Sequence, residues 1–340
     1  MSEHGRPLPR RKARRGDVHI ATIAELAGVS PPTVSKVLNG RSGVGEQTRQ
    51  RVEALLQEHG YRRPSVSRAT PALEVVFGSM VGSIAIEILR GVQQVAIERD
   101  CSVSFTDIRP HDRWLEPLLL RQPTGVIAVC PLLTGQHAEL AASGVPMLAL
   151  DPVGGLPVPA VGSNNWSGAL TATRHLLELG HRRIAVITGA VEYLSARARL
   201  DGFRAALDHA GILFDENLER RGVFTFDGGR KPAQELLALP ERPTAIVCGD
   251  DLQAMSVYEA ARQAGLRIPD DLSVVGFDDI DLAAWLAPPL TTVRQPFAEM
   301  GVTAARLVLE LADGKILEQD RYELGTTLVV RASTAPPRSF

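Results

Sequence analysis

The amino-acid sequence predicts a small all-α headpiece with a helix-turn-helix, followed by an α/β body of two doubly wound lobes with parallel sheets. Three observations predict this architecture. Residues 21–61 carry apolar residues at helical spacing in three short segments. From Leu73 onward, short apolar runs alternate with amphipathic segments in two successive series. The chain has 340 residues, of which 44% are hydrophobic, enough to bury the cores of more than one domain.

The charge is distributed unevenly between these two parts. Residues 1–70 contain 13 Lys and Arg against 6 Asp and Glu, a balance of +7, so the remainder of this chain of net charge −2 stands at −9. A basic module on an acidic body suits phosphate binding by the module alone, although a solvated charged surface gives the same asymmetry. Residues 1–18, rich in Arg and Pro, are predicted to be a disordered tail that either adds nonspecific phosphate contacts or only aids solubility.

The first two helices of the headpiece are predicted from their capping residues. Thr22 and Glu25 have the spacing of a capping box, which places the start of the first helix just before Ile23. A turn around Gly28 follows. Ser30 is then expected to cap the second helix, with Pro31 in the first turn, where a missing N–H costs nothing.

The second helix is predicted to have one apolar face and one small polar face. Its inward side carries Val34, Val37 and Leu38. Its outward side carries Pro32, Thr33, Ser35 and Lys36. A third helix over 46–58 would complete the core with Val52, Leu55 and Leu56. Two helices joined by a tight turn, the second with an exposed polar and basic face, are typical of a helix that enters the DNA major groove.

The body is predicted to begin at Leu73 and to contain two strand–helix series. The first series has strands at 73–77, 102–106, 125–129 and 146–151, with helices at 84–99, 112–121 and 135–143. The second has helices at 166–179, 195–210, 229–238 and 252–264, with strands at 183–188, 220–224, 245–249 and 273–279. A helix over 297–314 and strands at 322–324 and 327–331 would return across the lobe boundary. We expect an N-terminal lobe of 73–164 plus 296–323 and a C-terminal lobe of 165–295 plus 324–340.

Several other functions are disfavoured by the sequence. Cys101, Cys130 and Cys248 are odd in number and lack metal-ligand spacing, which favours reduced thiols in a cytoplasm. His175 and His181 have no Cys or carboxylate at ligand spacing, so no metal is predicted. The sequence has no GxGxxG or P-loop motif, so no cofactor is predicted either. No apolar run approaches the length of a membrane span, and no secretory signal follows the basic amino terminus.

The sequence resembles one known family over nearly its whole length. The runs AGVSPPTVSKVLNG, VGEQTRQRV and EHGYR resemble the headpiece of the LacI/GalR (lactose-repressor) family of bacterial transcription regulators. The runs HLLELGHRRIAVITG, SARARLDGFRAAL, AIVCGDDLQAMSVYEAARQAGLRIPDDLSVVGFDD and PPLTTVRQPFAEMG resemble its periplasmic-binding-protein-like core. The resemblance implies a headpiece at 19–63, a hinge at 64–72, a homodimer, and binding to pseudo-palindromic double-stranded operator DNA.

The resemblance also implies which residues contact DNA. The expected contacts are Thr22, Ser30, Pro31, Pro32, Thr33, Ser35, Lys36, Asn39, Tyr61 and Arg68. Lys36 can reach a guanine edge, and Arg68 would lie in the minor groove. The hinge departs from the family, because Thr70 stands where a leucine wedge is expected. Either another apolar side chain replaces the wedge or this protein kinks its operator less.

A ligand cleft is expected at the carboxyl ends of the body's strands, where open α/β sheets bind their ligands. Acidic, amide, arginine and aromatic residues follow these strands, a combination that suits the hydroxyls and the apolar face of a sugar. By resemblance, Arg199 grips the effector, Asp278 and Asp151 accept its hydroxyls, and Phe224 stacks on it. The full expected set is Ser79, Asp151, Trp166, Ser195, Arg199, Phe224, Asp250 and Asp278.

Less specific roles remain open for some of these residues. Asp250 and Asp279 would also serve as helix caps, and Trp285 would also fit a core or a subunit interface. Many family members carry Asn at the position of Asp250, and the extra charge favours a neutral saccharide over an anion.

The sequence thus predicts a cytoplasmic bacterial transcription regulator, a repressor of carbohydrate-utilisation genes controlled by a neutral mono- or disaccharide. One alternative is a sugar-binding protein without a DNA-linked role. A second is an α/β enzyme acting on sugars, for which Asp250 and Asp278 are the only candidates for a general acid/base pair.

Overall fold

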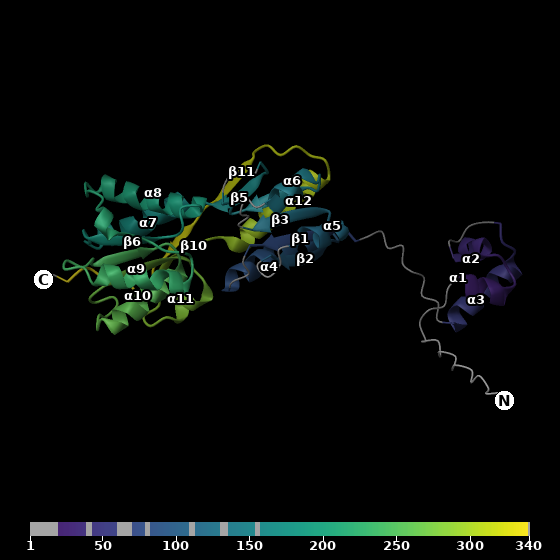
Figure 1. Cartoon of the computed structure of the whole chain (residues 1–340), viewed down its shortest axis with the longest axis horizontal. Coiled ribbons are helices and arrows are strands. Elements are labelled where there is room, and N and C mark those ends of the chain that lie inside the picture. The colour runs from purple at the N-terminus through teal and green to yellow at the C-terminus, as the bar shows by residue number, and fades with distance from the viewer. Residues whose placement is uncertain are drawn as a thin grey trace, which may run out of the picture. The chain divides into compact units, whose positions relative to one another are not determined.

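The computed structural model describes residues 20–38, 43–59, 70–78, 82–108, 113–129, 135–153 and 157–338. Its internal contacts divide the chain into one unit up to Ala69 and a second unit from Thr70 onward. Figure 1 shows the two units as a small helical headpiece and a larger body of sheets and helices. Among the described helices, none has the length and apolar content needed to cross a bilayer.

The headpiece consists of three helices around one apolar core. Helix α1 (Ile20–Ala27), α2 (Pro31–Leu38) and α3 (Glu46–Glu58) confirm the three predicted segments. Their buried residues are Ile23, Ala24, Ala27, Val34, Val37, Val52 and Leu56. The turn between α1 and α2 requires Gly28, whose φ of +63° is strained for any residue with a side chain. The predicted capping box is wrong, because α1 already begins at Ile20 and Thr22 lies inside its first turn.

The body contains two six-stranded sheets, which confirms the predicted fold class. The first sheet has the order β11 (Arg321–Leu324), β5 (Ala160–Ser163), β4 (Met147–Leu150), β3 (Gly125–Val129), β1 (Ala72–Phe77) and β2 (Ser102–Asp107), with every pairing parallel. The second has the order β12 (Thr327–Val329), β10 (Thr291–Arg294), β9 (Ser273–Asp278), β8 (Ala245–Cys248), β6 (Ile184–Thr188) and β7 (Glu219–Arg221). Only β12 is antiparallel to its neighbour among these pairings.

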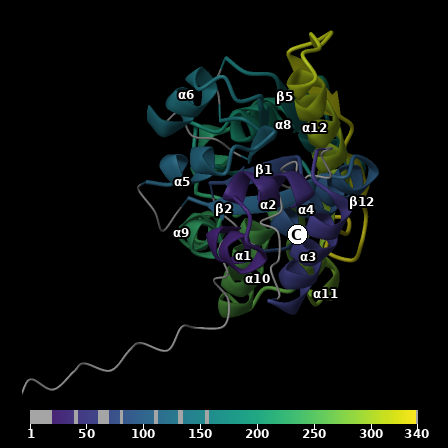
Figure 2. The same ribbon diagram turned by 90° about the vertical axis from the view of Figure 1, so that its right-hand side faces the viewer.

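Helices cover both faces of the first sheet. Successive side chains of a strand point to opposite faces, so Val75 and Phe77 pack under α4 (Gly82–Glu98) and α12 (Phe297–Ala312). Val76 faces the other side, toward α5 (Leu115–Leu120) and α6 (Gly135–Ala142). Figure 2 shows α5 and α6 to the left of these strands and α4 and α12 to the right. The body therefore begins with a layered α/β lobe.

The second sheet is layered in the same way. Helices α7 (Asn165–Glu178) and α8 (Leu194–His209) share a core with Val186 and Phe277 on one face. Helices α9 (Phe226–Leu237), α10 (Asp251–Gln263) and the short α11 (Asp281–Trp285) cover the other face (Figure 1). Near-continuous burial on both faces explains why these strands read as apolar runs without alternation.

The sequence missed some short elements of the body. Strand β10 and helix α11 were not predicted. The strand expected at 220–224 ends at Arg221, so Phe224 lies in the loop that follows it. Elements of three to five residues show too few turns or alternations for a period to be visible.

Three chain segments cross between the two sheets. They follow β5, β10 and β11, and they lie near Asn164, Pro296 and Gly325. Hydrogen bonds tie two of the crossings together: Asn164 N donates to Leu324 O at 2.8 Å, and Thr326 Oγ1 donates to Asn164 O at 3.3 Å. The lobes are thus joined by a narrow, hydrogen-bonded set of strand ends.

Candidate functional site

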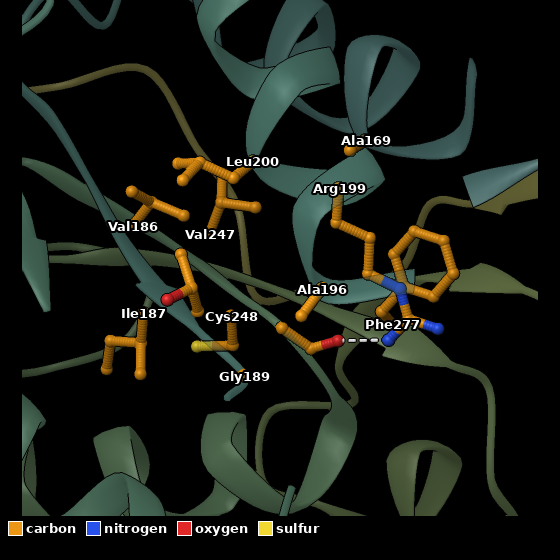
Figure 3. A pocket seen from close by; sticks show the side chains of 12 residues that line it. Ala169, Val186, Ile187, Gly189, Ala196, Arg199, Leu200, Val247, Cys248 and Phe277 are labelled. Carbon is orange, nitrogen blue, oxygen red and sulfur yellow. Dashed lines mark hydrogen bonds between the residues drawn. The ribbon is translucent and has the colours of Figure 1, made fainter. Parts of the chain in front are cut away.

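Arg199 lies at the centre of a polar cluster at the strand ends of the second lobe. It belongs to α8, and its side chain is only 9% exposed. Its guanidinium carbon lies 3.8 Å from the ring centre of Phe277 and 5.4 Å from that of Phe224. Figure 3 shows the guanidinium against the Phe277 ring, with the apolar side chains of Val186 and Val247 to the left of Arg199. These aromatic faces hold the cation in one orientation.

The guanidinium donors of Arg199 are directed at acceptors of the protein. Nε donates to Asn165 Oδ1 at 2.7 Å, and Nη1 donates to the carbonyl oxygen of Gly249 (Figure 3). Nη2 lies 3.5 Å from Asp278 Oδ1. Arg199 is thus held by several partners at a buried position, unlike the arginine of an exposed surface ion pair.

Asp278 ends β9 in the left-handed backbone region, with a φ of +109°. Its Oδ1 accepts a hydrogen bond of 2.6 Å from Gln295 Nε2. Burial raises the pKa of Asp278 to about 6, although Arg199 and Gln295 both favour the carboxylate. The negative charge of Asp151, at the end of β4 in the first lobe, adds to this rise. Acidic groups from both lobes therefore act on one another here.

Asp250 combines two roles that were alternatives in the sequence. It is the N-cap of α10, where its Oδ1 accepts from Gln253 N at 2.7 Å, and it also belongs to the buried cluster. Burial and the charge of Asp278 raise its pKa to about 7. Asp279 is not a cap, since its carboxylate pairs with Arg294 at 2.7 Å and Arg331 at 2.6 Å.

Phe224 is held against the cluster by two glycines. A Cβ atom on Gly189 would lie 2.3 Å from the ring, and one on Gly249 would lie 3.0 Å from it. Tyr193 packs edge-on against Phe224, with 5.6 Å between ring centres. Glycine is required at position 189 because any side chain there would displace the ring.

The remaining predicted effector residues are placed less centrally. Ser195 is buried in α8, one turn before Arg199. Trp166 lies in the first turn of α7 and is 43% exposed, whereas its neighbour Asn165 is the residue that contacts Arg199. Trp285 is 74% exposed, so its assignment to a core is wrong. Ser79 lies outside the described residues.

Sequence reasoning did not select Asn165, Phe277 or Gln295 for the site. The available signal for Asn165 was its place directly before the predicted helix 166–179. Phe277 reads as a core residue of β9. Gln295 follows β10, a strand that the sequence did not reveal, so its position at a strand end was hidden.

A small void and a larger cavity border the cluster. The void beneath Arg199 measures about 10 Å³ and is too small for a sugar, so a ligand would meet the cluster from its outer side. A cavity of about 250 Å³ lies at the lobe junction. It is lined by Ser83 and Glu87 of α4 and by Asp278 and Gln295 of the second lobe.

The described DNA-reading candidates gather on and beside α2. Pro31, Pro32 and Lys36 are exposed, and Thr33 and Ser35 are partly exposed, opposite the buried Val34 and Val37. Ser30 directly precedes α2, and its hydroxyl lies 2.9 Å from that of Thr33. Thr22 is exposed on α1. Asn39, Tyr61 and Arg68, together with most of the hinge and the tail 1–18, lie outside the described residues.

Comparisons with known proteins agree with this two-part organisation. Residues 19–64 match the model described as bacterial regulatory proteins, lacI family, and residues 173–334 match a periplasmic binding protein-like domain. The ribose operon repressor of Escherichia coli strain K12 is 34% identical over 324 residues, covering 92% of this chain and 98% of that protein.

Solved structures resemble the chain over both parts. A complex of the transcriptional regulator CelR with cellobiose is 32% identical, with a TM-score of 0.73, and covers 93% of this chain and 100% of that one. The lac repressor dimer bound to operator and the anti-inducer ONPF is 29% identical, with a TM-score of 0.76, and covers 94% and 100%.

Proposed function

The chain belongs to the lacI family of bacterial regulatory proteins, and we propose that it is a repressor whose affinity for operator DNA is set by a neutral saccharide bound between its lobes. The observation that carries this proposal is the buried cluster of Arg199, Asp278 and Asp250, with Phe224 beside it. The cluster offers acceptors for hydroxyl groups next to an aromatic face, as a sugar requires.

The charge of the cluster favours a neutral effector. Arg199 is already engaged by Asn165, Gly249 and Asp278, so it offers little to a phosphate or carboxylate. Asp151 and Asp250 add negative charge around it. An anion would therefore be repelled, whereas hydroxyls would donate to the carboxylates. The relatives that carry cellobiose or are named for ribose support a saccharide.

The DNA-binding role rests on the face of α2 and on the family. The exposed Lys36 and the partly exposed Thr33 and Ser35 present one positive charge and small polar groups, which suit a helix in the major groove. The lac repressor dimer bound to operator supports binding as a homodimer to two half-sites of a pseudo-palindrome. We place this activity in the bacterial cytoplasm, on the nucleoid when the operator is bound.

The two alternatives are less well supported. A sugar-binding protein without a DNA role does not account for a headpiece that matches the lacI family over residues 19–64. The protein is not an enzyme: its relatives over 92% of the chain are transcriptional repressors. Asp250, the candidate general acid or base, is committed to capping α10.

A thermal-shift screen tests the proposed effector class. The full chain is melted with neutral mono- and disaccharides, with nucleobases and with sugar phosphates, and each stabilising compound is then added to a gel-shift assay on the DNA upstream of the protein's own gene. We expect a neutral saccharide to raise the melting temperature and change the fraction of bound DNA. Stabilisation by nucleobases or sugar phosphates alone would show that the cleft is misread.

A further inference from the structure

The polar cluster closes into a ring of five side chains. Ser163 Oγ donates to Gln295 Oε1, and Gln295 Nε2 donates to Asp278 Oδ1 at 2.6 Å. Asp278 Oδ1 lies 3.5 Å from Arg199 Nη2, and Arg199 Nε donates to Asn165 Oδ1 at 2.7 Å. Asn165 Nδ2 returns to the carbonyl oxygen of Ser163 at 3.0 Å. Ser163, Asn165, Arg199 and Gln295 are buried, and the side chain of Asp278 is 11% exposed, so most of these bonds are shielded from competing water.

This ring joins the candidate effector contacts to the segments that connect the lobes. Ser163 is the last residue of β5, directly before the first crossing, and Gln295 is the residue directly before Pro296 at the second crossing. Arg199 and Asp278, in contrast, belong to the second lobe. Gln295 is the only described side chain for which hydrogen bonds to both Asp278 and Ser163 are found.

We propose that Gln295 is a positioning residue that couples effector binding at Asp278 to the relative orientation of the lobes, through Ser163. This inference rests on the function proposed above. The side-chain amide of Gln295 is one rigid planar group, with its nitrogen on Asp278 and its oxygen on Ser163. A ligand hydroxyl that reorients the Asp278 carboxylate therefore moves the amide and changes its bond to the end of β5.

The coupling has the form required of a two-state switch. An effector changes operator affinity only if it binds the two lobe arrangements with different free energies. The ring of side chains includes Asp278 and also Ser163 at the first crossing. Its hydrogen bonds depend on both the lobe arrangement and the ligand, so the ring provides the difference in binding free energy between the two lobe arrangements. Without the amide, the effector still meets Arg199 and Asp278, but the crossing no longer responds.

Substitution of Gln295 and of Ser163 tests the proposal in the full chain; the hydrogen-bonded path from Asp278 through Gln295 to Ser163 is called the relay below. Gln295→Met keeps the volume and removes the amide, and Ser163→Ala removes a single hydroxyl. For each variant, calorimetry gives the saccharide Kd, and fluorescence anisotropy gives the operator Kd with and without saturating saccharide. The probe is the saccharide that stabilises the wild-type chain, beginning with ribose and cellobiose. Gln263→Met, at an exposed glutamine of α10, is the matched control.

We expect Ser163→Ala, at a residue outside the cavity lining, to hold the saccharide within about threefold of wild type. In both variants, the ratio of the two operator Kd values should fall about tenfold toward one, within the usual range of allosteric coupling. The double variant should lose no more than either single one, because both substitutions break the same relay. A purely structural role would lower the melting temperature without this non-additive loss of coupling.

Three results would overturn the proposal. The first is a wild-type ratio in both variants. The second is loss of saccharide binding in Gln295→Met, which would make Gln295 a ligand contact. The third is additive effects in the double variant. If Gln295→Met does not fold, the ratio of the operator Kd values with and without saccharide in Ser163→Ala tests the proposal by itself. A wild-type chain that does not respond to any saccharide would instead refute the proposed function, and the relay with it.

Discussion

Asp250 and Asp278 are buried carboxyl groups whose pKa values, about 7 and about 6, lie well above the ordinary value of 3.8. Asp251, buried nearby, has a pKa raised in the same direction by burial and by the charge of Asp278. In the pH range between the ordinary and the raised pKa values, the folded chain binds more protons than the unfolded chain. Its stability therefore decreases as pH rises through that range, and it levels off above the raised values.

We therefore expect these carboxyl groups to lower the melting temperature of the effector-free chain as pH rises from about 4 to about 7, the range between their ordinary and raised pKa values. Asp250→Asn should reduce this fall, because asparagine still caps α10 but carries no charge to bury. Differential scanning calorimetry across the pH range measures both effects. Asp208→Asn, at an exposed position of α8, is the control. An unchanged pH dependence in Asp250→Asn would show that this carboxyl is not a source of the effect.

At the scale of single residues, the sequence identified the residue types of the site better than the hydrogen bonds between them. Arg199, Asp250, Asp278 and Phe224 lie together, as the family resemblance and the strand ends implied, although their contacts with an effector stay predictions. The partners of Arg199 and Asp278 could not be predicted, because hydrogen bonds between residues 34 and 17 positions apart leave no local pattern in the sequence.

At the scale of elements, close helix crossings depend on glycine. Helices α4 and α12 approach so closely that a Cβ atom on Gly91 would lie 1.9 Å from the carbonyl oxygen of Ala298. A Cβ atom on Gly301 would likewise lie 2.3 Å from the carbonyl oxygen of Ile88. These atoms belong to the backbone and cannot rotate away, so a larger residue forces the helices apart.

Gly91→Ala should destabilise the body by roughly 1–3 kcal/mol, the usual cost of overpacking a core. Urea unfolding followed by circular dichroism gives the free energy of unfolding. Gly135→Ala in α6 is the control, because a Cβ atom there would meet nothing within 4 Å. Equal stability of the two variants would contradict the close crossing.

Long amphipathic elements were also the most predictable ones. The predicted bounds of α3 agree with the structure, and those of α4 and α10 differ by no more than two residues. Strand β10 was missed because four residues after a Pro-Pro turn show no clear period. The antiparallel pairing of β12 was also unpredictable, since pairing depends on the path of the whole chain.

At the scale of the whole molecule, the headpiece and the body form separate units, so a change on α2 should affect DNA binding alone. Lys36→Ala should weaken operator binding about tenfold to a hundredfold and relax the sequence preference at one base pair, if the lysine reads a guanine edge. Saccharide binding should stay at the wild-type level. Anisotropy on operator variants and calorimetry measure these two quantities, with Gln57→Ala on α3 as the control.

A uniform loss of affinity for all operator variants would assign Lys36 to a phosphate rather than a base. The hinge that would carry the signal between the two units lies mostly outside the described residues, apart from Thr70 and Pro71, which are exposed, and Ala72, which begins β1. The effect of threonine in place of the expected leucine on DNA bending stays a prediction.

The crossings of the chain between the two sheets also determine the order in which the parts of the protein can fold during synthesis. The headpiece is a continuous segment, so it can fold as soon as it leaves the ribosome. The first lobe cannot be completed then, because α12 and β11 are contributed by residues 297–324. Throughout synthesis of the second lobe, the apolar face of α4 that α12 will cover, including Ile88 and Val92, has no permanent partner. Early termination of translation would therefore release a folded headpiece attached to an incomplete effector-binding body.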